Sequence, residues 1–138
     1  MSEREGMNGL IADVSAFHLA CGQPIEPQLL IPGERVDLRR RLIREEYTEL
    51  MKEGFGVLRG HEVDLVSLAD GLVDLIYVCV GTALEFGIPL DRVWLEVQRA
   101  NMAKAGPDGK VRYRDDGKVL KPDGWQPPDV HAAIGLKR

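Results

Sequence analysis

The 138-residue chain carries 44% hydrophobic and 29% charged residues and a formal net charge of −4, which is ordinary for one globular domain. No apolar run approaches the roughly 20 residues that span a bilayer, and the N-terminus shows no secretion signal. Two cysteines, Cys21 and Cys79, indicate no disulfide framework, and Cys79 lies in an apolar run where a small core residue is expected. We therefore expect a cytoplasmic protein without a membrane partner.

Charge is distributed unevenly along the chain. Residues 1–97 carry 9 Lys and Arg against 17 Asp and Glu, whereas residues 98–138 carry 9 Lys and Arg against 5 Asp. An acidic body with a basic tail can bind cations in one part and anions in the other, although solvated faces also differ by chance. We expect one domain over 1–138, with a helical core at about 10–104 and a basic hairpin and tail at 105–138.

Apolar side chains recur at three- and four-residue spacing in the first half of the chain, which predicts helices. The first helix is expected over about 10–21, where Gly22 ends it. A loop rich in proline and glycine follows at 23–34. The second helix is expected over about 36–53 and ends at Gly54.

Two further helices are predicted. The segment 64–86 is apolar on nearly every side, so it is expected to be the central helix. Gly87 ends this helix, and Pro89 opens the fourth, which is expected over about 89–104.

The composition changes after residue 104. The segments 110–114 (KVRYR) and 118–121 (KVLK) flank a glycine-ended turn, which predicts a short hairpin. The stretch 123–130 (DGWQPPDV) is rich in proline and glycine and is expected to be irregular.

Four glutamates share one arc of the second expected helix. At about 100° per residue, Glu45, Glu49, Glu53 and Glu46 fall at about 0°, 40°, 80° and 100° around the axis. Like charges one turn apart repel each other. Taken alone, such a pattern is most often just a solvated acidic face.

The third expected helix carries two aspartates in an apolar setting. Asp70 and Asp74 are one turn apart among Leu, Val, Ile and Ala. A carboxylate buried there is unfavourable by several kcal/mol unless it is paired or binds a metal. A network of salt bridges to arginines of the second helix is the structural alternative, and its members would be Arg40, Arg41 and Arg44.

If these two helices lie antiparallel, their carboxylates can converge on one pocket, as in helical bundles with metal sites. The predicted metal ligands are Glu45, Glu46, Glu49, Asp70 and Asp74. A set of oxygen ligands without His or Cys selects hard ions, Mg²⁺ first and Mn²⁺ next.

The end of the fourth expected helix is a candidate phosphate site. Asn101 and Lys104 are three residues apart and share a face, with Arg99 nearby, and Lys121 extends the positive region. Stabilisation of the helix dipole by cations in the last turn is the alternative role for Arg99 and Lys104. No glycine-rich phosphate loop is present in the sequence.

Two side chains are weaker candidates for contacts with a nucleotide base. His18 follows Phe17 near a helix end, where it could stack against or hydrogen-bond a base, although a packed structural histidine fits equally well. Tyr113 is a candidate for stacking, although most aromatic residues in a small protein belong to the core.

These residues resemble the all-α nucleoside triphosphate pyrophosphohydrolases, the superfamily of MazG, dimeric dUTPases and phosphoribosyl-ATP pyrophosphohydrolase. The family motif is ExxE, a spacer, then ExxD. Here 46–49 (EYTE) is similar to the first half and 70–74 (DGLVD) to the second, followed by a helix end, 96–104, that resembles the family's phosphate-binding segment. The segment 116–130 resembles the tail of phosphoribosyl-ATP pyrophosphohydrolase-like relatives. The family's second-half glutamate falls at position 71, where this chain has Gly71, so the role passes to Asp70.

The resemblance implies a MazG-like fold of the four-helix-bundle type with a short C-terminal hairpin and irregular tail, assembled as a dimer or tetramer. It also implies Mg²⁺-dependent conversion of a nucleoside triphosphate and water to a monophosphate and pyrophosphate. Glu46 or Glu49 would be the general base. We expect a nucleoside triphosphate substrate and no nucleic-acid polymer as partner.

Three alternatives remain open. The first is phosphoribosyl-ATP hydrolysis in histidine synthesis; the proline-rich loop and long tail favour nucleotide-pool housekeeping over it. The second is a non-catalytic helical module whose acidic face binds a basic partner. The third is a metal-storage or sensing bundle, which would not need Lys104 or a basic tail.

Overall fold

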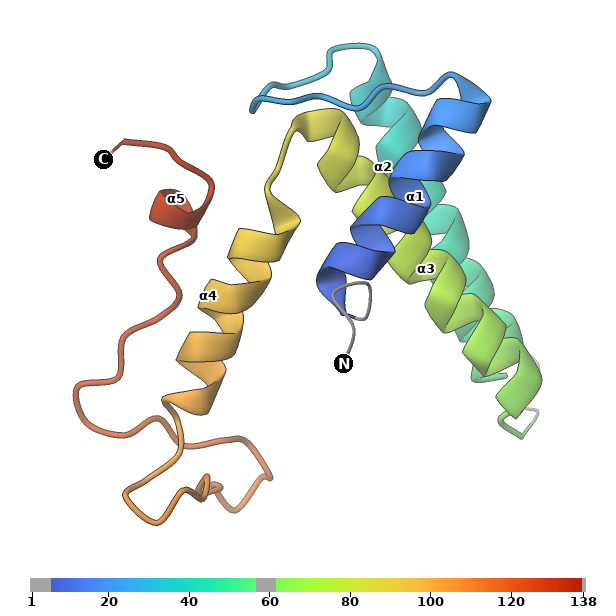
Figure 1. Ribbon diagram of the computed structural model, residues 1–138. Helices are drawn as coiled ribbons and strands as arrows, with labels where there is room; N and C mark the ends of the chain where they lie inside the picture. Colours follow the sequence, from blue (N-terminus) through green and yellow to red (C-terminus); the bar gives the residue numbers. More distant parts are fainter. Residues whose placement is uncertain (1–5, 57–61, 138) are drawn as a thin grey trace. The chain divides into compact units, whose positions relative to one another are not determined.

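The computed structural model describes residues 6–56 and 62–137. Over these residues the regular secondary structure is entirely helical, which confirms the predicted all-α class (Figure 1). The chain divides into two compact units, Met1–Ile88 and Pro89–Arg138.

The first unit contains three long helices, α1 (Met7–Cys21), α2 (Arg35–Glu49) and α3 (Leu65–Phe86). α3 packs against both α1 and α2 (Figure 1), which confirms its predicted central position. The side chain of Asp64 begins α3 by accepting hydrogen bonds from the amides of Val66 and Ser67, so Asp64 is the N-cap and not a helical residue.

The proline-rich loop between α1 and α2 completes the C-terminal end of α3. The amide of Glu26 donates to the Leu84 carbonyl at 2.9 Å. The amide of Leu30 donates to the Phe86 carbonyl at 3.1 Å. Gly87, with φ 64°, ends α3, and a Cβ at this position would lie 1.9 Å from a backbone oxygen of the loop. The loop therefore satisfies carbonyl groups that a helix end leaves without partners.

The second expected helix does not continue as an α-helix to residue 53. After Glu49 the chain forms a π-helix, η1 (Leu50–Gly54), in which the amide of Phe55 donates to the Leu50 carbonyl. Periodicity at 3.6 residues per turn cannot reveal this change, because the apolar spacing of the two forms differs by one residue over one turn. Short π segments are frequent at functional sites.

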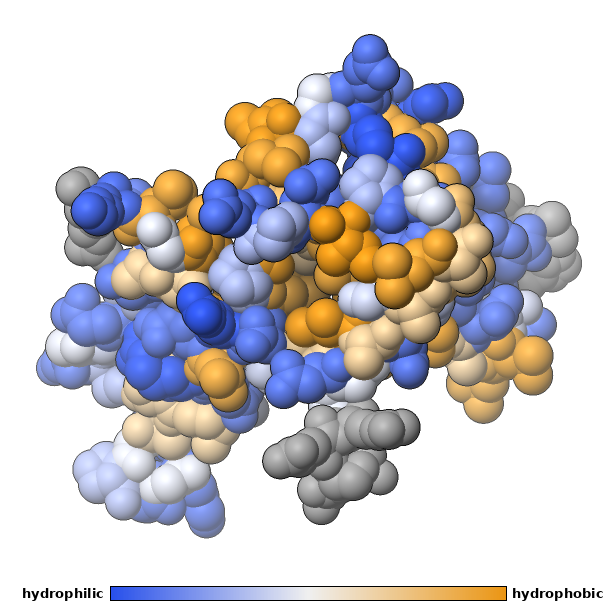
Figure 2. All heavy atoms as spheres, turned by 45° about the horizontal axis from the view of Figure 1, so that its top comes forward, coloured by the Kyte–Doolittle hydropathy of each residue, from blue (hydrophilic) through white to orange (hydrophobic). Residues whose placement is uncertain are grey.

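Much of α3 is less buried than its apolar sequence predicts. Its buried residues are Gly71, Val80, Gly81, Ala83 and Glu85. Leu65 and Val66, by contrast, are 75% and 80% exposed, and hydrophobic side chains are visible among hydrophilic ones on the surface in Figure 2. Cys79 is also exposed, so the expectation that it is a core residue was wrong.

By length and composition, α3 could cross a membrane. The expectation that no apolar run is long enough was therefore wrong. The central helix of a bundle has the same length and composition, so this property alone carries little weight.

The second unit contains α4 (Leu90–Met102) and the short α5 (Val130–Ala133), which contact each other. α5 was not predicted. It begins where the side chain of Asp129 accepts a hydrogen bond from the amide of Ala132. The predicted hairpin is present as a single bridge between Tyr113 and Val119.

Candidate functional site

The first half of the acidic site lies on the last turn of α2. Glu46 is half-buried, whereas Glu45 and Glu49 are exposed. η1 starts directly after Glu49 and carries Glu53, which is half-buried. The π-helical turn thus follows the first half-motif without interruption.

The second half lies on α3. Asp74 is half-buried and Asp70 is exposed, so the expectation that both aspartates are buried was wrong for Asp70. A cavity of about 290 Å³ lies between the two halves. Its lining is formed by Glu49, Glu53, Ser67, Asp70, Gly71 and Asp74.

Carboxylates from both helices act on Glu46. Burial raises the pKa of this glutamate, and the nearby negative charges raise it further, that of Asp74 most and those of Glu49, Glu45 and Asp70 after it. Two helices therefore bring the other four predicted ligands within electrostatic range of Glu46. Such a set of like charges favours binding of a proton or a cation.

Arginines of α2 do not neutralise the predicted ligands. Arg40 and Arg41 both form ion pairs with Asp37, near the start of the helix. Over the described residues, 6–56 and 62–137, none of the five carboxylates forms an ion pair within 4.0 Å. The salt-bridge network considered as the alternative is therefore absent from this part of the chain.

Close packing sets the register between α2, η1 and α3. A Cβ added at Gly71 would lie 3.0 Å from Leu50 Cδ1 and 3.3 Å from Leu50 Cα. A Cβ added at Gly54 would lie 3.0 Å from Leu68 Cα. Leu50 contacts Gly71, whereas the later Gly54 contacts the earlier Leu68, so the two segments run antiparallel. In this register Glu46 lies level with Asp74.

The Gly71 contact also explains the departure from the family motif. Position 71 faces the backbone of η1, so a glutamate side chain does not fit there without displacing Leu50. Ser67, three residues before Asp70, lines the acidic cavity instead, and its hydroxyl donates to Asp64 at 3.0 Å. A longer side chain at position 67 would therefore extend into the cavity.

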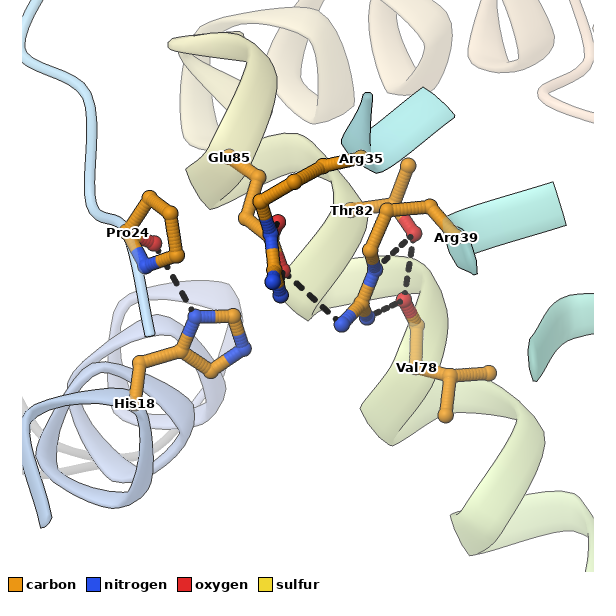
Figure 3. Close-up of polar contacts among 7 residues, drawn as sticks. All are labelled: His18, Pro24, Arg35, Arg39, Val78, Thr82 and Glu85. Atoms are coloured by element: carbon orange, nitrogen blue, oxygen red, sulfur yellow. Dashed lines mark hydrogen bonds and ion pairs between the residues drawn. The ribbon is translucent and has the colours of Figure 1, made fainter. Parts of the chain in front are cut away.

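A buried ionic cluster at the other end of the two helices was missed by sequence reasoning. Arg39 donates from Nη1 to Glu85 Oε2 at 2.9 Å, and Arg35 also binds this carboxylate (Figure 3). The Glu85 side chain is completely buried. Arg39 additionally donates to the Val78 carbonyl and to Thr82 Oγ1. Burial lowers the pKa of Arg39, while the hydrogen bond to Glu85 raises the pKa of Arg35.

His18, a predicted base contact, lies beside this cluster. It is only 2% exposed, and its Nδ1 lies 3.1 Å from the Pro24 carbonyl (Figure 3). A Cβ added at Gly81 would lie 2.7 Å from His18 Nε2 and 2.6 Å from Arg39 Nη2. This position favours the packing role that we considered as the alternative, and a contact with a base stays a prediction.

The predicted phosphate-side residues all lie in the second unit. Lys104 donates from Nζ to Asn101 Oδ1 at 2.9 Å, and its ammonium lies over the Trp125 ring, as does that of Lys121. Arg99 instead binds Glu96 through two nitrogens.

Arg99 has a structural role in the same unit. Its partner Glu96 accepts a further hydrogen bond from the amide of Asp129, at the start of α5. Both hydrogen bonds lower the pKa of Glu96, that from Arg99 most. Tyr113, the second predicted base contact, is 64% exposed.

The acidic site fits a hard divalent cation by its chemistry. Its donors are all carboxylate oxygens, which Mg²⁺ and Mn²⁺ prefer. In the described residues no three Asp, Glu, His or Cys side chains already stand close enough to chelate one ion. The arrangement offers the ligands and the negative charge, and binding would require the side chains to close on the ion.

Antiparallel helices with facing carboxylates agree with the arrangement that the resemblance to the MazG-like all-α pyrophosphohydrolases implies. A family model confirms this: the chain belongs to the phosphoribosyl-ATP pyrophosphohydrolase family, whose model matches residues 14–101. The match spans α2 and α3 with both half-motifs and ends at Asn101, so Lys104 and the tail lie beyond it. A comparison with curated proteins finds no match.

Proposed function

We propose that this pyrophosphohydrolase converts a nucleoside or deoxynucleoside triphosphate and water to a monophosphate and pyrophosphate, as part of nucleotide-pool housekeeping. The supporting observation is the set of five carboxylates that α2 and α3 bring together without cationic partners among the described residues. The family match supports cleavage of the same kind of phosphoanhydride bond.

The proposal assigns a role to each acidic side chain. Mg²⁺, or Mn²⁺ in its place, would be held by Glu45, Glu46, Glu49, Asp70 and Asp74. When bound, the ion would neutralise charge on the phosphate oxygens and make water more acidic. Glu46 is one candidate for the general base, because it is a half-buried carboxylate beside Asp74. Glu49 is the other candidate.

Basic side chains of the second unit would bind the substrate's phosphates. Lys104 supplies a positive charge, and Asn101 already accepts a hydrogen bond from it. Lys121 adds a second ammonium beside the same Trp125 ring. Arg99 is the weakest of the predicted phosphate ligands, because its guanidinium is engaged with Glu96.

Phosphoribosyl-ATP is the second candidate substrate, and the description of the matching family favours it. Its hydrolysis breaks the same bond and also releases pyrophosphate. Phosphoribosyl-ATP differs from ATP in the group attached to the adenine base. Binding of the phosphates at the acidic cluster would not distinguish the two substrates.

The deciding experiment is a screen of all common nucleoside and deoxynucleoside triphosphates, together with phosphoribosyl-ATP, with products separated by chromatography. We expect a monophosphate and pyrophosphate in Mg²⁺ and no turnover in EDTA. Glu49→Gln and Asp74→Asn should abolish turnover while circular dichroism shows an intact fold. Asp37→Asn is the matched control, because this carboxylate binds Arg40 and Arg41 outside the cluster.

Full activity in EDTA would contradict the metal role. Release of a diphosphate and orthophosphate would assign a different reaction. If no substrate turns over, the non-catalytic helical module becomes the better interpretation.

Self-association is the second part of the proposal. Exposed Leu65, Val66 and Val73 place large apolar side chains on α3. A contiguous apolar patch on a protein surface often marks a site of contact with another molecule. We therefore propose that a second copy of the chain covers these residues in a dimer or tetramer.

A further inference from the structure

The second compact unit contains a basic pocket, and none of its lining residues belongs to the lining of the acidic cavity. Its volume is about 330 Å³, within the range of small-molecule sites. Lys104, Arg112 and Lys121 contribute three positive charges to its lining, against one negative charge from Asp123. The three cations come from the end of α4 and from both sides of the hairpin.

Two of these cations lie against the ring of Trp125. Its Nε1 donates to the Ala100 carbonyl at 2.7 Å, which anchors the ring to α4. The Nζ atoms of Lys104 and Lys121 lie 5.3 Å and 4.8 Å from the ring centroid. Attraction to the ring stabilises each ammonium group, but two like charges around one ring still repel each other. An anion bound in the pocket that both lysines line would offset this repulsion.

The hairpin supplies the third cation. The amide of Leu120 donates to the Arg112 carbonyl at 2.8 Å, so Arg112 lies beside the segment that leads to Lys121. The ion pair of Arg112 with Asp108 is long, at 3.6 Å, and exposed, so it contributes little stability. The guanidinium can therefore exchange this carboxylate for an anion in the pocket.

Other arginines of the unit differ from Arg112. Arg114 binds Asp116 through two nitrogens, and Arg99 binds Glu96 in the same manner. These bidentate pairs satisfy their guanidinium groups. Arg112, by contrast, has only its long contact with Asp108 among the ion pairs of the described residues.

We propose that this pocket is a binding site for a phosphoanhydride anion, with pyrophosphate as its ligand, and that it binds without a metal ion. The proposal rests on the function above, because Lys104 and Lys121 are assigned there to the substrate's phosphates and pyrophosphate is the product named there. Three cations, one of them a forked guanidinium, suit an anion with several negative charges on adjacent phosphates. Orthophosphate offers fewer charges and should bind more weakly.

Trp125 provides the readout. The chain has two tryptophans, and Trp94 is 55% exposed, so Trp94→Phe leaves Trp125 as the single indole reporter. The full-length Trp94→Phe protein is titrated with sodium pyrophosphate in EDTA, and tryptophan emission is followed. We expect a saturable change, because an anion draws the two ammonium groups away from the ring.

Three variants in the Trp94→Phe background test the residues. Lys121→Met and Arg112→Met keep much of each apolar stem but remove the charge, and each should weaken pyrophosphate binding at least about 10-fold, as expected for loss of a charge-assisted hydrogen bond. Lys118→Met removes the same charge from the same hairpin outside the pocket lining and should weaken binding less than about 3-fold. Calorimetry with the same proteins checks the fluorescence result.

The proposal is overturned if pyrophosphate does not bind in EDTA, or if Lys118→Met weakens binding as much as Lys121→Met, since general charge would then explain the effect. It is also overturned if orthophosphate binds as tightly as pyrophosphate. No turnover is measured, so a negative result here leaves the proposed hydrolysis standing. A failure of hydrolysis likewise leaves this pocket standing.

Discussion

Arg39 of α2 donates a hydrogen bond to Glu85 of α3 across 2.9 Å, and the two side chains are 4% and 0% exposed. Along α2, Arg39 lies about two turns before Glu46, and along α3, Glu85 lies about three turns after Asp74. The pair therefore fixes how α2 and α3 align, and with them the two halves of the acidic site. Buried ion pairs do not always stabilise a fold, but loss of one partner leaves an unpaired buried charge.

Replacement of Glu85 by Gln should consequently lower the free energy of unfolding by roughly 3–5 kcal/mol. Urea unfolding followed by circular dichroism measures this change. Asp37→Asn disrupts only exposed ion pairs and should change stability by less than about 1 kcal/mol. Equal effects of the two substitutions would show that the buried cluster does not hold the helices in register.

Gly71→Ala should destabilise the protein by about 1–3 kcal/mol, as expected for overpacking. The added methyl group would lie 3.0 Å from Leu50 Cδ1 and 3.3 Å from its backbone. Ser67→Glu, by contrast, points a further carboxylate into the acidic cavity and should make stability depend more strongly on Mg²⁺. Thermal melts with and without Mg²⁺ distinguish the two. A stable Gly71→Glu protein would refute the close approach of α3 and η1.

Glu46 should give the metal-free protein a pH-dependent stability. Its pKa in the folded protein is raised above the ordinary 4.5 by burial and by neighbouring carboxylates, so the folded chain holds this proton more tightly than the unfolded chain. The resulting stabilisation is complete below the unfolded pKa and is lost as pH rises through the folded pKa. Glu46→Gln cannot ionise and should melt at a higher temperature than the wild type above this window.

Melts in EDTA between about pH 4 and pH 8 test this prediction. At the acid end the two proteins should melt at similar temperatures. Added Mg²⁺ should stabilise the wild type more than the variant at neutral pH. A wild type that gains stability relative to Glu46→Gln as pH rises in EDTA would contradict the assignment.

Lys104→Ala should reduce kcat/KM by roughly 10- to 150-fold if this ammonium binds a phosphate of the substrate. Its loss also removes contacts with Asn101 and Trp125, so a stability loss of about 1 kcal/mol is expected as well. Asn101→Ala should act in the same direction but less strongly. Lys110→Ala is the matched control, an exposed lysine outside the basic pocket. Proportional losses of activity and stability would indicate a structural role only.

Val66→Lys should shift the protein towards the monomer in light scattering at micromolar concentration. Val66 is 80% exposed on α3, and a charge there would be buried in the proposed contact between copies, which is strongly unfavourable. Gln126→Lys adds the same charge to an exposed position in the second unit and should leave the mass unchanged. A fully active wild-type monomer would contradict the assembly.

Local signals account for the part of the fold that could be predicted. Gly22 and Gly87 end α1 and α3 in the left-handed conformation, and glycine at a helix end is recognisable in a sequence. Long-range contacts account for what was missed. Glu85 appeared as one acidic residue in an apolar segment, and only the fold brings Arg35 and Arg39, about fifty residues earlier, onto it.

The acidic site divides in the same way. Helical spacing alone groups Glu45, Glu46 and Glu49 on one arc. Spacing cannot show that Leu50 fills the space beside Gly71, or that Ser67 lines the cavity. Both facts depend on how closely α3 and η1 approach each other.

The π-helical turn at Leu50–Gly54 has a consequence for how this chain compares with related sequences. A π turn holds one residue more than an α turn, so η1 is equivalent to a one-residue insertion placed directly after the first half-motif. An alignment that assumes uninterrupted α-helical periodicity would therefore be shifted by one residue between Leu50 and the loop before α3. Deletion of a single residue within η1 would restore the α-helical period, and because the wider turn had absorbed the extra residue, Gly54 would keep nearly its present place beside Leu68.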